Sequence, residues 1–318
     1  MSSRVRPEEL LKRLEELWAT LGGQQNGEST GVLRACAMTL VVAGESSTDD
    51  AEVGETLAAL MRDHPSRAIV LRLIEGGEPS IEARVLAQCW MPFGRRQQIC
   101  CEQIEITLTA PSLPDLPPVI RGLTAPDLPL MLWCRSPRLP GDPAFRPLCA
   151  LADKVILDSE QAADPLALLR DLRADASGVR RFADLAWTRL TSWRQQVAEL
   201  FENPAHLERL AEFRRALIGY AGARVPMEAR YLESWLRRGL PGLECRFERT
   251  GEAPTEARRS ALVAATLFLA DQPHAMTAAG TTTETPGDYE LLREELGIPG
   301  ADPVYENVVK DLLAGAPV

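Results

Sequence analysis

The chain has 318 residues, of which 45% are hydrophobic and 25% charged, the usual balance of a globular protein with its own core. Its 35 basic and 45 acidic residues give a formal net charge of −10. Nucleic acids and anionic membranes attract proteins through a positive field, so this charge excludes both as main partners and favours a protein or a small molecule.

The first predicted element is an amphipathic helix over residues 7–21. Pro7 suits its first turn, leucines recur at intervals of three and four, and Gly22 ends it. The polar stretch 22–31 is typical of a linker. We therefore treat residues 1–33 as a helix and linker, with the helix packed on the body of the protein or on a partner.

Neither a signal peptide nor a membrane span is predicted. Charges interrupt the first apolar stretch, "EELLKRLEELWATLGG", where a signal peptide needs an unbroken apolar centre. The longest later apolar run, 261–270, is about half the length that spans a bilayer. We expect a cytoplasmic protein.

Residues 34–202 alternate between strand and helix patterns. Several strands are apolar throughout, as in "CAMTLVVA", "RAIVLRLI" and "LPLMLWC", which indicates a sheet covered on both faces. The segments "IEARVLAQCW" and "ICCEQIEITL", joined by a basic turn, predict an antiparallel pair. The fold expected here is a three-layer α/β domain with an inserted antiparallel pair.

Residues 203–318 predict a smaller α+β domain. Asn203-Pro204 breaks a long helix and sets the expected boundary. A helix or strand around 207–220, a helix, two strands and two terminal helices follow, the last capped by Asp302 with Pro303 in its first turn.

No catalytic or metal-binding motif is present. The sequence lacks the glycine-rich nucleotide-binding motifs, HExxH and GxSxG, and its seven cysteines and three histidines show no zinc spacing. Most cysteines lie in apolar runs, where reduced, buried thiols are expected. Cys100 and Cys101 are adjacent in a strand and point to opposite faces, which disfavours a disulfide between them. We expect no metal and no cofactor.

Three arginines stand out in turns and loops. Arg67 follows a helix-stopping proline at the start of a strand, away from the carboxyl ends where α/β sheets bind ligands, which favours a structural or partner-binding role. Arg135 and Arg138 follow the carboxyl end of a strand. They could hold an anion there, although an ordinary solvated loop is the favoured explanation.

The segment "FADLAWTRLTSWRQQVAEL" (182–200) predicts one helix with a core face and two polar flanks. At about 100° per residue, Trp193 falls in the middle of the apolar face. Trp187 and Arg194 share one flank, where the guanidinium can cover the ring, and Arg189 lies on the other. We expect Trp187 and Arg194 to contact either a partner or the second domain, and we retain Arg189 as a partner-binding candidate.

Taken together, "HPSRAI", "LPLMLWC", "KVILDS", "FADLAWTRLTSWRQQV" and "GADPVYENVV" resemble the glucose-6-phosphate dehydrogenase assembly protein (OpcA) family of bacteria. The most specific part is "DLAWTRLTSWR", in which Ser192 replaces a proline of the family pattern. The resemblance implies a non-enzymatic factor that binds glucose-6-phosphate dehydrogenase, promotes its active oligomer and raises its activity.

Two qualifications follow from the residues. Photosynthetic relatives are linked to redox control through cysteines near the C-terminal end, whereas here no cysteine follows Cys245, so redox switching is not expected. The alternative to an activator is a small α/β enzyme or sensor that binds a sugar phosphate through Arg135 and Arg138.

Overall fold

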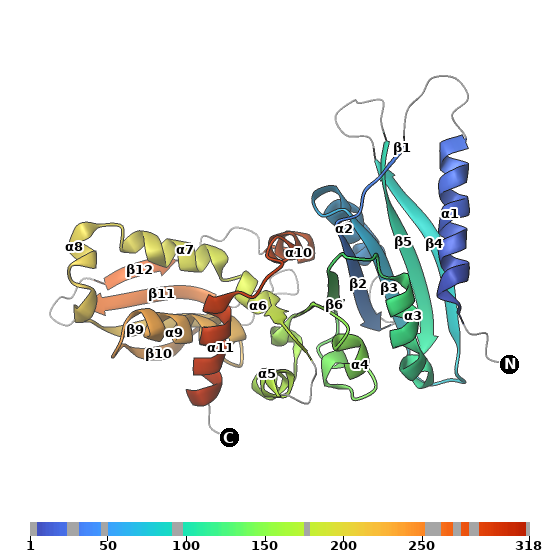
Figure 1. Ribbon diagram of the computed structural model, residues 1–318. Helices are drawn as coiled ribbons and strands as arrows, with labels where there is room; N and C mark the ends of the chain where they lie inside the picture. The colour runs from blue at the N-terminus through green and yellow to red at the C-terminus, as the bar shows by residue number, and fades with distance from the viewer. Residues whose placement is uncertain are drawn as a thin grey trace. The chain divides into compact units, whose positions relative to one another are not determined.

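A computed structural model describes residues 5–23, 32–45, 50–90, 98–174, 179–251, 262–269, 275–279 and 286–315. The chain divides into two compact units (Figure 1): unit 1 comprises Met1–Ala183 with Leu292–Pro299, and unit 2 comprises Asp184–Leu291 with Gly300–Val318. The predicted linker at 22–31 lies largely outside the described residues. None of the described helices has the length and apolarity to cross a membrane.

Unit 1 is built on a mostly parallel sheet with strand order β1-β5-β3-β2-β6-β7-β8, and β4 is added antiparallel to β5. The predicted α/β class and the inserted antiparallel pair are therefore confirmed. The strands are β1 (Val32–Arg34), β2 (Met38–Glu45), β3 (Ser66–Ile74), β4 (Ile81–Trp90), β5 (Gln98–Thr109), β6 (Leu130–Cys134), β7 (Lys154–Leu157) and β8 (Phe182–Asp184).

The central strands form the core of this unit because their sequences are apolar on both faces. All five residues of β6 and nearly all of β2 are buried. Helices connect the parallel strands, as crossovers in such sheets require. They are α2 (Asp50–Asp63), α3 (Leu116–Leu123), α4 (Arg146–Cys149) and α5 (Pro165–Arg173).

The N-terminal helix α1 (Pro7–Gly23) is part of unit 1 (Figure 1). Its apolar face packs on β4 and α3, and Leu10 and Leu14 are buried. The packing is close: a Cβ atom on Gly122 of α3 would lie 2.7 Å from the Pro7 ring. The helix predicted over 7–21 is thus confirmed, and it packs on the body of the protein.

The cysteines correct one expectation. Cys89 of β4 and Cys100 of β5 lie directly opposite each other and are joined by a disulfide, with Cα atoms 4.1 Å apart. Adjacent residues of a strand point to opposite faces, which argues against a disulfide between Cys100 and Cys101. The same argument does not apply to a cysteine on the neighbouring strand, such as Cys89. Cys89 and Cys100 are therefore not reduced thiols; the free cysteines are Cys36, Cys101, Cys134, Cys149 and Cys245.

We predict five titratable thiols in the protein unfolded without reductant and seven after reduction. The count needs denatured protein, because burial raises the pKa of the Cys101 and Cys245 thiols to about 11 and keeps them protonated. Titration with a thiol-specific reagent in denaturant makes the measurement. Seven thiols before reduction would contradict the disulfide.

The boundary between the units differs from the expected one at 202/203. Residues 182–200 are not one helix: strand β8 ends at Asp184, α6 (Leu185–Thr188) follows, and α7 (Thr191–Leu200) begins after a break at Arg189 and Leu190. The chain enters unit 2 at Asp184.

Unit 2 contains a mixed sheet with strand order β10-β9-β11-β12, in which β9 and β10 are parallel and β11 is antiparallel to both its neighbours. The segment around 207–220, open between helix and strand, is mainly strand β9. The elements are α8 (Pro204–Leu207), β9 (Phe213–Ala221), α9 (Met227–Gly239), β10 (Glu244–Gly251), β11 (Leu262–Leu269), β12 (Ala275–Ala279), α10 (Asp288–Leu296) and α11 (Pro303–Gly315).

Residues 292–299, the second half of α10 and the turn after it, belong to unit 1. Lys154, at the start of β7, holds them: its buried ammonium group pairs with the Glu295 carboxylate and donates to the Ile298 carbonyl at 2.7 Å. A cation suits this position, because the carbonyls at a helix C-terminus carry partial negative charge.

Candidate functional site

The segment "DLAWTRLTSWR", which carries the most specific part of the family resemblance, begins unit 2. Asp184, its first residue, fixes the local structure. One carboxylate oxygen of Asp184 accepts from the Ala186 backbone N–H at 3.0 Å and caps α6. The other oxygen accepts from the Tyr231 hydroxyl of α9 at 2.7 Å. Asp184 is fully buried, so these bonds replace the water that its charge has lost.

Trp187 of α6 lies at the centre of an aromatic cluster. Its indole N–H donates to Asp302 at 3.0 Å, and its ring contacts Tyr231 and Tyr305 with centroids 6.0 and 5.7 Å away. Only 3% of Trp187 is exposed. The contact expected for this residue is therefore made inside unit 2.

Asp302 connects the cluster to the last helix. While one oxygen receives the indole N–H, the other accepts from the backbone N–H groups of Val304 and Tyr305 at 2.9 and 3.1 Å. The predicted cap is thus present, and the same carboxylate also fixes Trp187. We use the name aromatic cluster for Asp184, Trp187, Tyr231, Asp302 and Tyr305.

Tyr231 is held in its neutral form. Burial, and after it the charge of Asp184, raises the pKa of Tyr231 well above its ordinary value. Tyr231 therefore remains a neutral hydrogen-bond donor to Asp184. A neutral buried donor on a buried carboxylate is suited to fixing geometry.

Arg194 covers the outer face of this cluster. Its guanidinium carbon lies 3.8 Å from the centroid of the Trp187 ring, and the group donates to the Thr191 hydroxyl at 2.9 Å. Arg194 is half-buried, so solvent or a partner can reach part of its side chain. The expectation that Arg194 covers Trp187 is confirmed, as is the core position of Trp193, which is 6% exposed.

Arg189 lies at the break between α6 and α7 and is buried. Its guanidinium donates to Glu228 of α9 at 3.0 Å, and both side chains are at most 2% exposed. A charge removed from water this completely needs a partner of opposite sign. The pair fixes the break to α9, and Arg189 has almost no surface to offer a partner.

Arg67 is also buried, in unit 1. Its guanidinium donates to Glu102 of β5 and to the Leu123 carbonyl, each at 2.6 Å. Glu102 further accepts from Trp18 of α1 at 2.8 Å and pairs with Arg34. Arg67 thus belongs to a network that joins α1, α3 and the sheet, which is the structural role expected as one alternative.

Arg135 and Arg138 lie at the carboxyl ends of the parallel strands and are engaged by carboxylates. Arg135 pairs with Glu52 at 2.9 Å, whereas Arg138 pairs with Glu45 at 2.7 Å and with Glu75 at 3.2 Å. The hydrogen bond that Arg138 donates to Glu45 raises the pKa of Arg138. An anion at this edge would have to displace these carboxylates.

Two of the three histidines make structural hydrogen bonds. His64 Nε2 lies 2.8 Å from the Arg293 carbonyl, and His206 Nδ1 lies 2.8 Å from the Leu200 carbonyl. His274 is outside the described residues. Within the described ranges no three histidine, cysteine or acidic residues gather as metal ligands.

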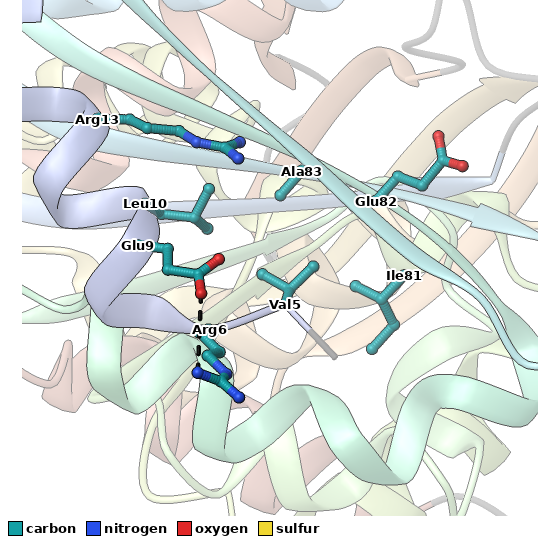
Figure 2. Close-up of a pocket in the computed structure, with 8 residues that line it drawn as sticks. All are labelled: Val5, Arg6, Glu9, Leu10, Arg13, Ile81, Glu82 and Ala83. Atoms are coloured by element: carbon teal, nitrogen blue, oxygen red, sulfur yellow. Dashed lines mark ion pairs between the residues drawn. The ribbon is translucent and has the colours of Figure 1, made fainter. Parts of the chain in front are cut away.

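Two shallow grooves lie on the antiparallel edge of unit 1, away from these residues. One, of ≈ 250 Å³, lies between α1 and the start of β4, where Arg6, Leu10 and Ile81 are among its lining residues (Figure 2). The other, of ≈ 300 Å³, lies over β4 and β5 and is lined by Arg72, Arg84 and Glu105, among others.

Sequence reasoning missed three of the four residues that complete the site in unit 2. Asp184, Glu228, Tyr231 and Asp302 supply its buried hydrogen bonds and charges, but only Asp302 was recognised, as a helix cap. A signal was present for Asp184, which precedes α6 as an N-cap residue does. Nothing in the local pattern connects Tyr231 or Glu228 to this segment, because both lie on a helix that follows the intervening strand.

The comparisons with known proteins account for both units. Residues 57–174 match the family model described as the glucose-6-phosphate dehydrogenase subunit N-terminal domain, and residues 180–309 match its C-terminal domain. The two matched segments meet close to Asp184, where the structure divides. The chain therefore belongs to the OpcA glucose-6-phosphate dehydrogenase assembly family.

The curated relatives are named OxPP cycle protein OpcA. The protein from Nostoc punctiforme is 32% identical over 176 residues, which are 54% of this chain and 37% of the relative. The one from Synechocystis sp. is 29% identical over 171 residues, 53% of this chain and 35% of the relative. The matched region is thus little more than a third of each relative.

Solved structures show a weaker likeness. A Bacillus subtilis protein described as an oxidoreductase has a TM-score of 0.42 at 9% identity and covers 86% of this chain and 94% of its own. A Sinorhizobium meliloti protein described as a myo-inositol dehydrogenase has a TM-score of 0.39, with the same identity and coverage. At these scores the likeness carries no conclusion.

Proposed function

We propose that this protein is a non-enzymatic factor of the oxidative pentose phosphate pathway, which binds glucose-6-phosphate dehydrogenase and stabilises its active oligomer. The observation that carries the proposal is the pair of family matches, which together extend over both units. In support, the titratable residues most suggestive of function are engaged in structural contacts: Arg67, Arg189 and Asp184 all lie in buried networks.

The activation follows from linkage. A partner shifts an equilibrium between active and inactive forms only if it binds one of them more tightly. A tenfold shift requires about 1.4 kcal/mol of differential binding, a modest demand on a protein interface. The factor needs no catalytic group of its own for this effect.

We propose that Arg194 contributes to the contact with the dehydrogenase. Among the candidates Arg67, Trp187, Arg189 and Arg194, it alone is half-buried, whereas the other three are buried. It also stands on a rigid base, since the Trp187 ring beneath it is fixed by Asp302. Arginine is one of the residue types enriched at interface hot spots.

The test replaces Arg194 with alanine and measures dehydrogenase activity with and without the protein. We expect activation to fall several-fold while the protein stays folded, because a half-buried cation–π contact contributes only about 1–2 kcal/mol. The matched control is Gln195→Ala, an exposed neighbour on α7 that should retain activation. Full activation by Arg194→Ala would remove this residue from the contact.

A second arm addresses the enzymatic alternative. The protein alone is expected to turn over neither sugar phosphates nor lactones. Turnover of about 1 s⁻¹, the low end for ordinary enzymes, that disappeared on Arg138→Ala would favour a sugar-phosphate enzyme.

A further inference from the structure

Strand β4 is an edge strand of the sheet, and α1 packs against it. It pairs with β5 without a register shift over all ten residues, and no other strand of the described ranges pairs with it. Natural edges are blunted by bulges, prolines, charged side chains, short length or a covering helix, and β4 has neither a bulge nor a short length. The sequence "IEARVLAQCW" contains no proline or lysine, and all but three of its residues are half-buried.

The hydrogen-bonding pattern shows which backbone groups face outward. The Thr109 N–H donates to the Ser80 carbonyl, so the even-numbered residues of β4 bond to β5. The Cys100 carbonyl is consistent with this pattern. It accepts from the Ala35 N–H on the side of β5 away from β4, as an even-numbered residue of β5 should. Ile81, Ala83 and the odd-numbered residues beyond them therefore direct N–H and C=O groups to the outer edge.

The charges on this strand are complementary to themselves. Glu82 and Arg84 lie on one face, two positions apart, and both are exposed. Arg84 pairs with Glu105 of its own chain, and its exposed guanidinium can bridge to a second carboxylate. If a second β4 runs antiparallel with a two-fold axis at Ala83, Glu82 of each copy lies opposite Arg84 of the other. These are non-hydrogen-bonded positions, where cross-strand side chains are closest.

The groove beside the strand also carries one acidic and one basic side chain near Ala83. Glu9 and Arg13 of α1 line it next to Ala83, while Glu82 lies on the side of the strand away from α1 (Figure 2). Trp18 of α1 reaches Glu102, which pairs with Ala87, so α1 and β4 run in the same direction. The same two-fold axis therefore brings Glu9 of one copy toward Arg13 of the other.

We propose that the outer edge of β4 is a self-association surface, on which a second copy of this chain adds its own β4 antiparallel about Ala83. The two copies thereby form one continuous sheet. This inference is independent of the proposed function, because it concerns the protein alone.

The test is sedimentation of the full chain between about 1 and 100 µM, a range that detects micromolar association. Wild type is expected at twice its 34.9 kDa mass. Val85→Pro removes an outward N–H that β5 does not use, which edge strands tolerate, and should give a monomer. The control Val85→Ala retains the N–H and should remain a dimer.

A second variant covers the case in which proline impairs folding. Ala83→Lys places two like charges opposite each other at the axis, and the half-buried position accommodates the side chain. It should raise the dissociation constant at least tenfold while circular dichroism is unchanged. Monomeric wild type at about 100 µM, or dimers in folded Val85→Pro and Ala83→Lys, would overturn the proposal. Monomeric wild type whose dehydrogenase activation is lost in Val85→Pro would assign the edge to another partner and overturn it equally.

Discussion

Replacement of Trp187 by alanine is expected to lower the free energy of unfolding by about 3–5 kcal/mol, the usual cost of deleting a buried aromatic side chain. The ring packs against Tyr231 and Tyr305, which also contact each other, and its N–H donates to one oxygen of Asp302. The substitution therefore leaves both a cavity and an unpaired acceptor. Chemical denaturation followed by circular dichroism measures the change.

Trp187→Phe separates these two effects. It retains most of the packing and loses the hydrogen bond to the Asp302 carboxylate, which should cost about 1–3 kcal/mol because the acceptor is charged and only half-buried. Loss of dehydrogenase activation by Trp187→Ala would then follow from loss of structure. A fully stable Trp187→Ala protein would show that the aromatic cluster does not hold unit 2 together.

The second large effect is expected at Arg189. Arg189→Met leaves the Glu228 carboxylate buried without this partner, and breaking a buried pair in this way typically costs about 3–5 kcal/mol. Chemical denaturation of wild type and variant, followed by circular dichroism, makes the comparison.

The double variant Arg189→Met with Glu228→Leu is the control for charge. Two apolar side chains of similar volume can replace a buried ion pair at little cost, so the double variant should recover much of the stability that Arg189→Met loses. Equal or greater loss in the double variant would show that packing at the break between α6 and α7, and not the ion pair, sets the stability.

Sequence periodicity was sufficient for the elements whose pattern is local. It predicted α1 from its leucines, the central strands from their continuous apolar runs, and the β4–β5 pair. It also placed Trp193 in the core. It read 182–200 as one helix because the apolar spacing continues through Arg189 and Leu190, where the backbone turns between α6 and α7. That error displaced the expected domain boundary.

The candidate site depends on contacts that no local pattern contains. Trp187 and Asp302 are 115 positions apart, and one carboxylate both caps a helix and receives an indole N–H. The sequence of 182–200 could show that Trp187 needs cover but not what covers it. For Cys89 and Cys100, pairing required the strand register, which a turn of unknown conformation leaves open.

The arginines show that the sequence also leaves open which charged side chains are buried. Arg67 and Arg138 are equally polar in sequence, but Arg67 is buried against Glu102 whereas Arg138 is exposed between two acids. Burial and partner decide whether a guanidinium is structural or available, and both are properties of the fold.

Co-sedimentation with glucose-6-phosphate dehydrogenase from the same organism tests the central proposal most directly. With each protein at about 10 µM, well above the micromolar range, we expect one boundary that contains both chains and sediments faster than the dehydrogenase alone. The oligomer of the dehydrogenase should persist to lower concentration in its presence. Two boundaries that sediment independently, with an unchanged dehydrogenase oligomer, would contradict the proposal.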